Sequence, residues 1–391
     1  MLDTITITMN NIGKIITKPE AFTPPLQRYG DTYFVDYRTG RHTLNHHSEL
    51  TYYPSLTVTS GWKDRQPIAQ LKISFSVTKL LYQNNVDELG EEDFSLIFPT
   101  LQKRLQEIGV IVTEEEVKNA PVMSVHFSKN LLIKDTSTTA VIDTLRKGAI
   151  THRLEVNIRD FKDYGKALYL DNGSFQIVIY DKVADAFRSL RHASDKDRTS
   201  IQQNLLKSIR KSHQPIEILR FEVRIPTKRQ LNYLLQKLGF NQNLRLSDLF
   251  NYDLAEKMLM YHWDILVPIK SRFLLKFPES DTLSQVIGYE IKNHLKLNTW
   301  KSLGIALLIY HQREYGARNL EATLTSLYSR RTWYRLSKES TTLINNLTNQ
   351  SESFTWAEDI EQAFEHYAPF KVKSLEVINN NNGFATPQKV N

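Results

Sequence analysis

The sequence predicts an α+β protein, with an antiparallel sheet in roughly the first 228 residues and helices after it. Two observations carry this prediction. Segments such as LKISFSV and RLEVNI alternate apolar and polar residues with period two, as strands with one buried face do. Beyond about residue 227, apolar residues recur with helical spacing instead, and few strand-like runs remain.

The strands are predicted from this alternation and from their β-branched and aromatic content. Asn172-Gly173, between KALYL and SFQIVIY, is a strong signal for a tight hairpin, which would make its flanking segments antiparallel neighbours. The predicted strands are Thr4–Met9, Ser55–Thr59, Ala69–Ser76, Val122–Phe127, Arg153–Ile158, Ser174–Tyr180 and Ile216–Ile225.

The helices are predicted from apolar stripes at helical spacing. In Glu92–Ile108 the stripe is clear, but Pro99 argues against one unbroken helix. The other predicted helices are Thr138–Lys147, Ser200–Lys211, Arg229–Leu238, Leu246–Leu259, Leu283–Leu295, Thr299–Tyr315 and Asn319–Leu327.

Three parts follow from this pattern. Residues 1–228 are expected to form an α+β domain and residues 229–373 a helical domain. The boundary lies near Pro226, although no Gly/Ser linker marks it. Residues 374–391 are polar and rich in asparagine, which predicts a disordered tail.

The composition excludes several classes of protein. With 41% hydrophobic and 24% charged residues, the chain is typical of soluble globular proteins. No segment approaches the ~20 apolar residues of a membrane span, and the N-terminus lacks an export signal. We therefore expect a cytoplasmic protein without a membrane partner. The absence of cysteine excludes disulfides, thiolate zinc sites and a cysteine nucleophile.

The charge of the chain favours a polyanionic partner, because its net value is +7. Eleven Lys and Arg residues, against four acidic ones, lie between Arg188 and Gln230. Such runs are usually solvated helix faces, but this one lies between two strands that carry candidate catalytic residues. Candidate DNA contacts are Lys207, Arg210 and Lys211 in this run, with Lys79 and Lys129 earlier in the chain.

The candidate catalytic residues lie on two strands. Tyr180 ends the apolar strand of FQIVIYDK, Lys182 follows two residues later, and a lone Glu222 lies within LRFEVRI. A tyrosine at a strand end is most often a packing residue. Together, however, a phenol, an ammonium and a carboxylate are the groups needed to cut DNA covalently. The phenol attacks a phosphodiester, the ammonium stabilises the phenolate or the phosphorane, and the acid helps to hold a divalent metal.

The segment 316–340 predicts a helix-turn-helix. Gly316 is placed to end one helix, NLEATLTSLY forms a short second one, and Ser329 is a candidate N-cap for RRTWYRLSKES. Arginines in the first turns of such a helix can reach guanine edges or phosphates in the major groove. The alternative is a surface helix with Trp333 in the core. The candidate DNA contacts of this helix are Arg330, Arg331, Thr332 and Arg335.

The histidines do not form a recognised metal motif. The chain has eleven histidines and no His-x-His pair, the spacing that places two ligands on one face of a strand. His126 lies alone on its predicted strand, and a lone histidine is more often structural than a ligand. Lys129 and Asn130 follow it, so this strand end is expected to be open to solvent or substrate.

In order along the chain, several blocks resemble those of the filamentous-phage gene II/X family of rolling-circle replication initiators, relatives of the HUH endonucleases. The blocks are MLDTITITM, SVTKLLYQNNVDELGEEDF, SVHFSKNLLI, FQIVIYDK, LRFEVRI and SRRTWYRLSKES. The resemblance implies an HUH-like nickase domain followed by a DNA-binding domain, in a bacterial or phage-infected host. The implied partners are single-stranded DNA at the nick site, the double-stranded origin and a host helicase.

The resemblance also implies roles for individual residues. Tyr180 would form a 5′-phosphotyrosine and leave a 3′-OH, and Lys182 would assist at the phosphate. His126 would be a metal ligand with Glu222 as the nearest carboxylate, and Mg²⁺ or Mn²⁺ is the expected ion. The second histidine of the HUH pattern is missing, so Ser128, Glu155 or an unidentified Asp would have to replace it.

Two other functions remain open on the sequence. A non-catalytic origin-binding regulator would keep the fold without a working metal site, as the missing His-x-His allows. A related relaxase or transposase would use the same chemistry on another substrate. The chain has no Tyr-x-x-x-Tyr pair, and Tyr164 and Tyr169 are not on the predicted strand of Tyr180. A single-tyrosine mechanism is therefore the more economical hypothesis.

Overall fold

The fold is known here from a computed structural model. It describes residues 1–10, 12–35, 40–48, 50–63, 66–133, 136–147, 154–156, 166–192, 199–211, 217–267, 282–292, 299–315, 317–336, 338 and 355–372. The expected tail, 374–391, lies outside these residues.

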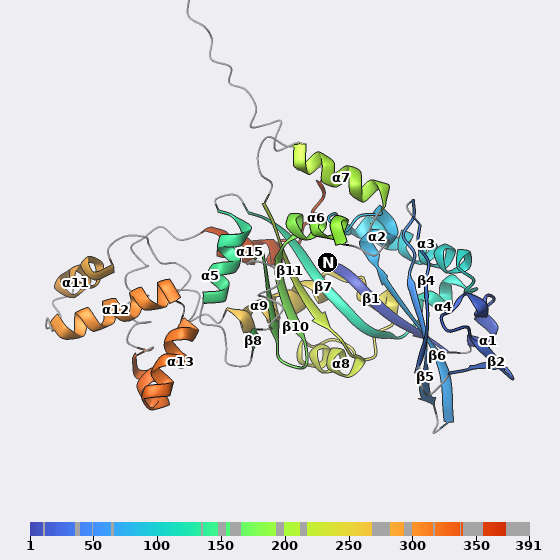
Figure 1. Cartoon of the computed structure of the whole chain (residues 1–391), viewed down its shortest axis with the longest axis horizontal. Helices are drawn as coiled ribbons and strands as arrows, with labels where there is room; N and C mark the ends of the chain where they lie inside the picture. The colour runs from blue at the N-terminus through green and yellow to red at the C-terminus, as the bar shows by residue number, and fades with distance from the viewer. Residues whose placement is uncertain are drawn as a thin grey trace, which may run out of the picture.

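Within the described residues, nine strands form one antiparallel sheet, as the predicted α+β class requires (Figure 1). The order across the sheet is β4-β5-β6-β1-β7-β11-β10-β9-β8. The strands are β1 (Leu2–Met9), β4 (Arg41–Asn45), β5 (Ser55–Lys63), β6 (Gln66–Ser76), β7 (Val122–Ile133), β8 (Glu155–Val156), β9 (Ala167–Asp171), β10 (Gln176–Asp181) and β11 (Glu217–Ile225). A separate pair is formed by β2 (Gln27–Tyr29) and β3 (Thr32–Phe34).

Most of the helices overlap predicted segments, but five of them, at residues 12–15, 77–82, 114–118, 182–192 and 355–365, were not predicted. They are α1 (Ile12–Ile15), α2 (Val77–Tyr82), α3 (Phe94–Glu107), α4 (Glu114–Lys118), α5 (Thr138–Lys147), α6 (Lys182–His192), α7 (Ser200–Lys211), α8 (Lys228–Lys237), α9 (Tyr252–Leu266), α11 (Thr282–Lys292), α12 (Thr299–Tyr315), α13 (Ala317–Leu327) and α15 (Thr355–Glu365). Short 3₁₀ turns are η1 (Pro19–Ala21), η2 (Glu91–Asp93) and η5 (Leu246–Leu249).

The segment predicted as one helix over Leu246–Leu259 is divided. Leu246–Leu249 forms η5, and α9 begins only at Tyr252. Asn251 causes the break, because its backbone is extended and its side-chain oxygen accepts a hydrogen bond from the Leu254 amide, as an N-cap does. Pro99, by contrast, is accommodated inside α3.

The hydrophobic core does not divide at residue 228, where the sequence suggested a domain boundary. Leu231 and Leu234 of α8, Trp263 of α9 and Phe364 of α15 belong to the same buried cluster as the strand residues. These helices contact β7 or β11. They therefore cover one face of the sheet and form a single unit with it. The helices α11, α12 and α13 lie beyond this unit, far from β4–β6 (Figure 1).

No described helix is both long and apolar enough to cross a membrane.

Candidate metal and tyrosine site

The face of the sheet opposite to α8 and α9 carries a row of polar side chains. In the antiparallel register, Glu222 of β11 lies opposite Ser128 of β7 on one side and Val178 of β10 on the other. Residues two apart on a strand share a face, so His126 and Tyr180 lie on the same face as Glu222. Three segments distant in sequence thus bring the predicted site residues together.

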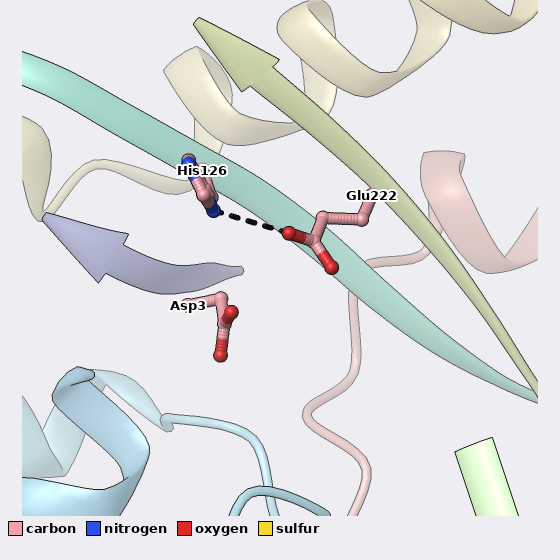
Figure 2. Close-up of side chains that lie close together, drawn as sticks. All are labelled: Asp3, His126 and Glu222. Atoms are coloured by element: carbon pink, nitrogen blue, oxygen red, sulfur yellow. Dashed lines mark ion pairs between the residues drawn. The ribbon is translucent and has the colours of Figure 1, made fainter. Parts of the chain in front are cut away.

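A fourth segment adds a residue that the sequence did not identify. Between Leu2 and Ile5 the pairing of β1 with β7 shifts register, an irregularity that re-aims the intervening side chains. Asp3 lies in this irregularity. One ligand atom each from Asp3, His126 and Glu222 lies within 4.8 Å of the others. Figure 2 shows the three side chains close together, with the ion pair between His126 and Glu222 dashed. The His126 Nδ1 to Glu222 Oε1 distance is 3.1 Å.

This cluster of one imidazole and two carboxylates, the acidic cluster, has the donor set of a divalent cation site. Asp3 is thus an aspartate beside His126 and Glu222, whereas the sequence had left Ser128, Glu155 or an unidentified Asp open as the third ligand. The Ser128 hydroxyl instead accepts a hydrogen bond from Arg220 at 2.8 Å. Glu155 belongs to β8, at the edge of the sheet.

Two arginines hold the carboxylates of the acidic cluster. Arg220 is buried, with Nη2 at 2.9 Å from Asp3 Oδ1 and Nη1 donating to the Asn85 carbonyl at 3.0 Å. Arg224 Nε donates to Glu222 Oε1 at 2.7 Å. Burial alone would raise the pKa of Asp3, but the Arg220 guanidinium outweighs it, and the pKa lies below its ordinary value. Both acids are therefore held as carboxylates.

Tyr180 is hydrogen-bonded to the acidic cluster. Its hydroxyl donates to Glu222 Oε2 at 3.1 Å. Burial, with a contribution from the Glu222 carboxylate, raises the pKa of Tyr180 well above its usual value despite the opposing effect of Arg220. The phenol is thus neutral at rest and already has a carboxylate to accept its proton. For a nucleophile, that arrangement supplies the base that a tyrosine needs.

Lys182 is the first residue of α6, which begins directly after β10. Its Nζ lies 5.5 Å from the centre of the Tyr180 ring and 3.5 Å from Asp185 Oδ2. Burial, with a smaller effect of Arg220, lowers the pKa of Lys182 to about 8. At neutral pH the ammonium remains charged beside the phenol.

These residues surround a polar cavity of about 360 Å³. Besides the acidic cluster, cations from two helices reach it, so it suits an anionic ligand near a metal site. Its lining residues are Asp3, Thr4, Ser76, Lys79, Asn85, His126, Tyr169, Tyr180, Lys182, Asp185, Glu222 and Arg224.

Lys129, a candidate DNA contact, does not face this cavity. Strand alternation places it with Phe127 on the core face. Its Nζ is buried, 2.6 Å from Glu88 Oε2, and donates to the Ala368 carbonyl at 2.7 Å. The expectation of an open strand end failed because β7 continues six residues beyond Phe127, to Ile133. Lys129 is therefore a buried cation that is paired with Glu88 and does not line the cavity of the acidic cluster.

Replacing Lys129 by Met is expected to lower the free energy of unfolding by about 3 kcal/mol or more, because Glu88 would be left buried without its counter-ion. Urea denaturation measures this loss. The exposed Lys207→Met variant on α7 is the control and should change stability by less than about 0.5 kcal/mol. A Lys129→Met protein of normal stability but weakened DNA affinity would restore Lys129 as a DNA contact.

The remaining DNA candidates occupy different places. Lys79 of α2 lines the cavity. Lys207 is exposed on α7, where the side chains of Arg210 and Lys211 lie outside the described residues. A helix begins at Arg330, directly after Ser329, and Trp333 is buried. Arg330, Arg331 and Arg335 are exposed, and Thr332 is half-buried.

No protein-family model, curated protein or solved structure matches this chain. The chemistry open to the site follows from its residues. A phenol donates to a carboxylate, that carboxylate belongs to a cluster able to hold a divalent cation, and an ammonium lies beside the phenol.

Proposed function

We propose that this protein is a replication initiator that nicks one DNA strand through a phosphotyrosine at Tyr180. The single observation that carries the proposal is the hydrogen bond from the Tyr180 hydroxyl to Glu222, because it couples a phenol nucleophile to the acidic cluster. The proposed domain is HUH-like, with Asp3 in place of the second histidine.

In the proposed reaction, the Tyr180 oxygen attacks phosphorus and the bond from phosphorus to the 3′-oxygen breaks. The phenol proton passes first to Glu222, and the released 3′-oxygen gains a proton. The DNA is left with a 5′-phosphotyrosine and a free 3′-OH that can prime synthesis. Lys182 offsets negative charge as it develops near the phenol oxygen.

Asp3, His126 and Glu222 would hold Mg²⁺ or Mn²⁺, since one nitrogen and several oxygen donors without thiolate suit these harder cations. When bound, the ion would neutralise charge on the scissile phosphate. Arg220 and Arg224 keep both carboxylates ionised and oriented for it.

The proposal predicts a metal-dependent covalent complex. Single-stranded oligonucleotides are made to cover the intergenic region of the replicon that encodes the protein. They are incubated with the protein and Mn²⁺, or with EDTA, and resolved on a denaturing gel. A protein–DNA adduct is expected with Mn²⁺ and not with EDTA. Tight duplex binding without an adduct under any metal would favour the non-catalytic origin binder.

We further propose that the helix beginning at Arg330 contacts the double-stranded origin, with α13 as the preceding helix of a helix-turn-helix. Only two residues, Tyr328 and Ser329, separate α13 from this helix. The buried Trp333 anchors it while its three arginines stay exposed. This arrangement supports phosphate or base-edge contacts from one helix face.

Replacing Arg330, Arg331 and Arg335 together by Ala is expected to weaken duplex binding and to flatten its salt dependence. Each lost phosphate contact should reduce the slope of log K against log salt by about 0.9. Fluorescence anisotropy across a salt series measures both. Replacing Lys103, Lys118 and Lys257, on α3, α4 and α9, removes the same charge and should leave the slope nearly unchanged. Equal slopes for the two triple variants would exclude the helix that begins at Arg330 as a contact to duplex DNA.

A further inference from the structure

Arg220, whose guanidinium holds Asp3, is itself held at few points. Its Nη2 lies 2.9 Å from Asp3 Oδ1 and also donates to the Ser128 hydroxyl. Its Nη1 donates to the Asn85 carbonyl at 3.0 Å. Its Nε is buried, 3.9 Å from Glu222 Oε2, and has no hydrogen-bond partner among the described residues. Because a guanidinium is a rigid planar fork, a shift of the Asn85 carbonyl would also turn the nitrogen that faces Asp3.

Asn85 is fixed by a glutamine that lies 117 residues later in the chain, on α7. Gln202 is buried, and both ends of its side-chain amide are used on Asn85. The amide oxygen accepts from the Asn85 backbone amide at 3.1 Å, and the amide nitrogen donates to the Asn85 side-chain oxygen at 3.0 Å. Two hydrogen bonds of opposite direction set both the position and the orientation of Asn85.

The start of α7 contacts the same loop at a second point. The Thr199 hydroxyl accepts from the Gln202 backbone amide at 3.2 Å, as an N-cap does. The same hydroxyl donates to the Gln83 carbonyl. Gln83 has a left-handed backbone, with φ 59°, and ends α2. The first turn of α7 therefore holds the loop at Gln83 and at Asn85, and Asn85 also lines the cavity of the acidic cluster.

We propose that Gln202 is a positioning residue for the acidic cluster, which acts through Asn85 and Arg220. This inference rests on the proposed function, because it takes the acidic cluster as the site of Mg²⁺ or Mn²⁺. Gln202 sets the place of Asn85, the Asn85 carbonyl sets the direction of Arg220, and Arg220 orients the Asp3 carboxylate. Removing the direct partner of a metal ligand commonly costs about 10- to 100-fold in metal affinity. Gln202 lies two residues further out, so we expect a smaller loss, about fivefold.

The test measures Mn²⁺ binding to the whole protein without DNA, from the electron paramagnetic resonance signal of free Mn²⁺. Gln202→Met keeps the length of the side chain and removes its amide, so the Kd for Mn²⁺ is expected to rise about fivefold. Gln106→Met makes the same change at an exposed position of α3 and should bind Mn²⁺ as wild type does. Leu234→Ala, in the core on the other face of the sheet, should lower stability without changing the Kd.

Asn85→Ala tests the route from Gln202 to the acidic cluster. It removes the side-chain oxygen that accepts from Gln202 and keeps the carbonyl that accepts from Arg220. If Gln202 acts through Asn85, the two losses overlap, and the double variant binds Mn²⁺ about as well as the weaker single variant.

Three results would overturn the positioning role of Gln202. They are a wild-type Kd in Gln202→Met, losses that multiply in the double variant, and an equal loss in Leu234→Ala. Each of them leaves the nickase intact. A wild-type protein that binds no Mn²⁺ would instead remove the metal site of the proposed function, and the role of Gln202 with it.

Discussion

Replacing Tyr180 by Phe is expected to abolish the covalent protein–DNA adduct, with a loss in initial cleavage rate on the order of 10⁴-fold or more. The substitution removes one oxygen, the atom that would bond to phosphorus. It also removes the hydrogen bond to Glu222. Ring packing is retained, so the fold should persist. Single-turnover cleavage of a labelled oligonucleotide, with adducts read on a denaturing gel, measures the effect.

The control for this variant is Tyr261→Phe. Tyr261 lies on α9, and its hydroxyl accepts a hydrogen bond from Lys237 at 2.7 Å, outside the cavity. Its loss should leave the cleavage rate within about twofold of wild type, because it changes no group that touches DNA. If Tyr180→Phe formed adducts at the wild-type rate, the nucleophile would have to be another residue.

Replacing Glu222 by Gln is expected to slow cleavage about 10²- to 10⁴-fold, the usual cost of removing a positioned base. The amide cannot accept the Tyr180 proton as a carboxylate does, and it is a poorer ligand for a divalent cation. It also leaves Arg224 without its counter-ion at 2.7 Å. The same single-turnover assay, repeated over a Mn²⁺ titration, separates slow chemistry from weak metal binding.

Glu217→Gln is the matched control for Glu222→Gln. Glu217 lies on the same strand, but it accepts hydrogen bonds from the Thr138 amide and hydroxyl at the start of α5. The same chemical change there should leave the cleavage rate within about twofold of wild type. Equal losses in both variants would mean that the effect comes from β11 as a whole.

The Glu222 variant should also change acid stability. Burial would raise the pKa of Glu222. The hydrogen bond from His126 and the positive charges of Arg224 and Arg220 outweigh burial and hold this pKa well below the usual 4.5. A depressed pKa stabilises the folded state fully above about pH 4.5, and this contribution is lost as pH falls through the folded value. Acid unfolding followed by circular dichroism should therefore be less steep in Glu222→Gln. An unchanged profile would contradict the ionised state assigned to Glu222.

Local sequence patterns predicted most of the sheet, because alternation and turn residues act over a few neighbours. The Asn172-Gly173 signal is realised as a hairpin, with Gly173 at φ 78° and the Asn172 side chain accepting from two following amides. β4 was not predicted: its segment, RHTLN, is short and mostly polar, and its pairing with β5 is set by tertiary structure.

The candidate site was only partly accessible from sequence. Alternation within LRFEVRI places Arg220, Glu222 and Arg224 on one face, a signal that these charges neutralise one another. Arg220 and Arg224 were instead counted as part of a run of free basic residues. Asp3 could not be found, because its approach depends on an irregularity in β1 and on pairing with a strand more than 120 residues later. Tyr169 was noted only as lying off the strand of Tyr180, and it lines the cavity because β9 pairs with β10 across the hairpin.

The arrangement of the acidic cluster determines when this site can assemble during synthesis of the chain. β1 contributes Asp3, but β11, which carries Glu222 and joins β7 to β10, is made far later. The Phe370 amide donates to Glu88 Oε2 at 2.9 Å, which ties the segment after α15 to the loop that follows α2. A nascent chain therefore cannot bring Asp3, His126 and Glu222 together until β11 has been made and has paired with β7.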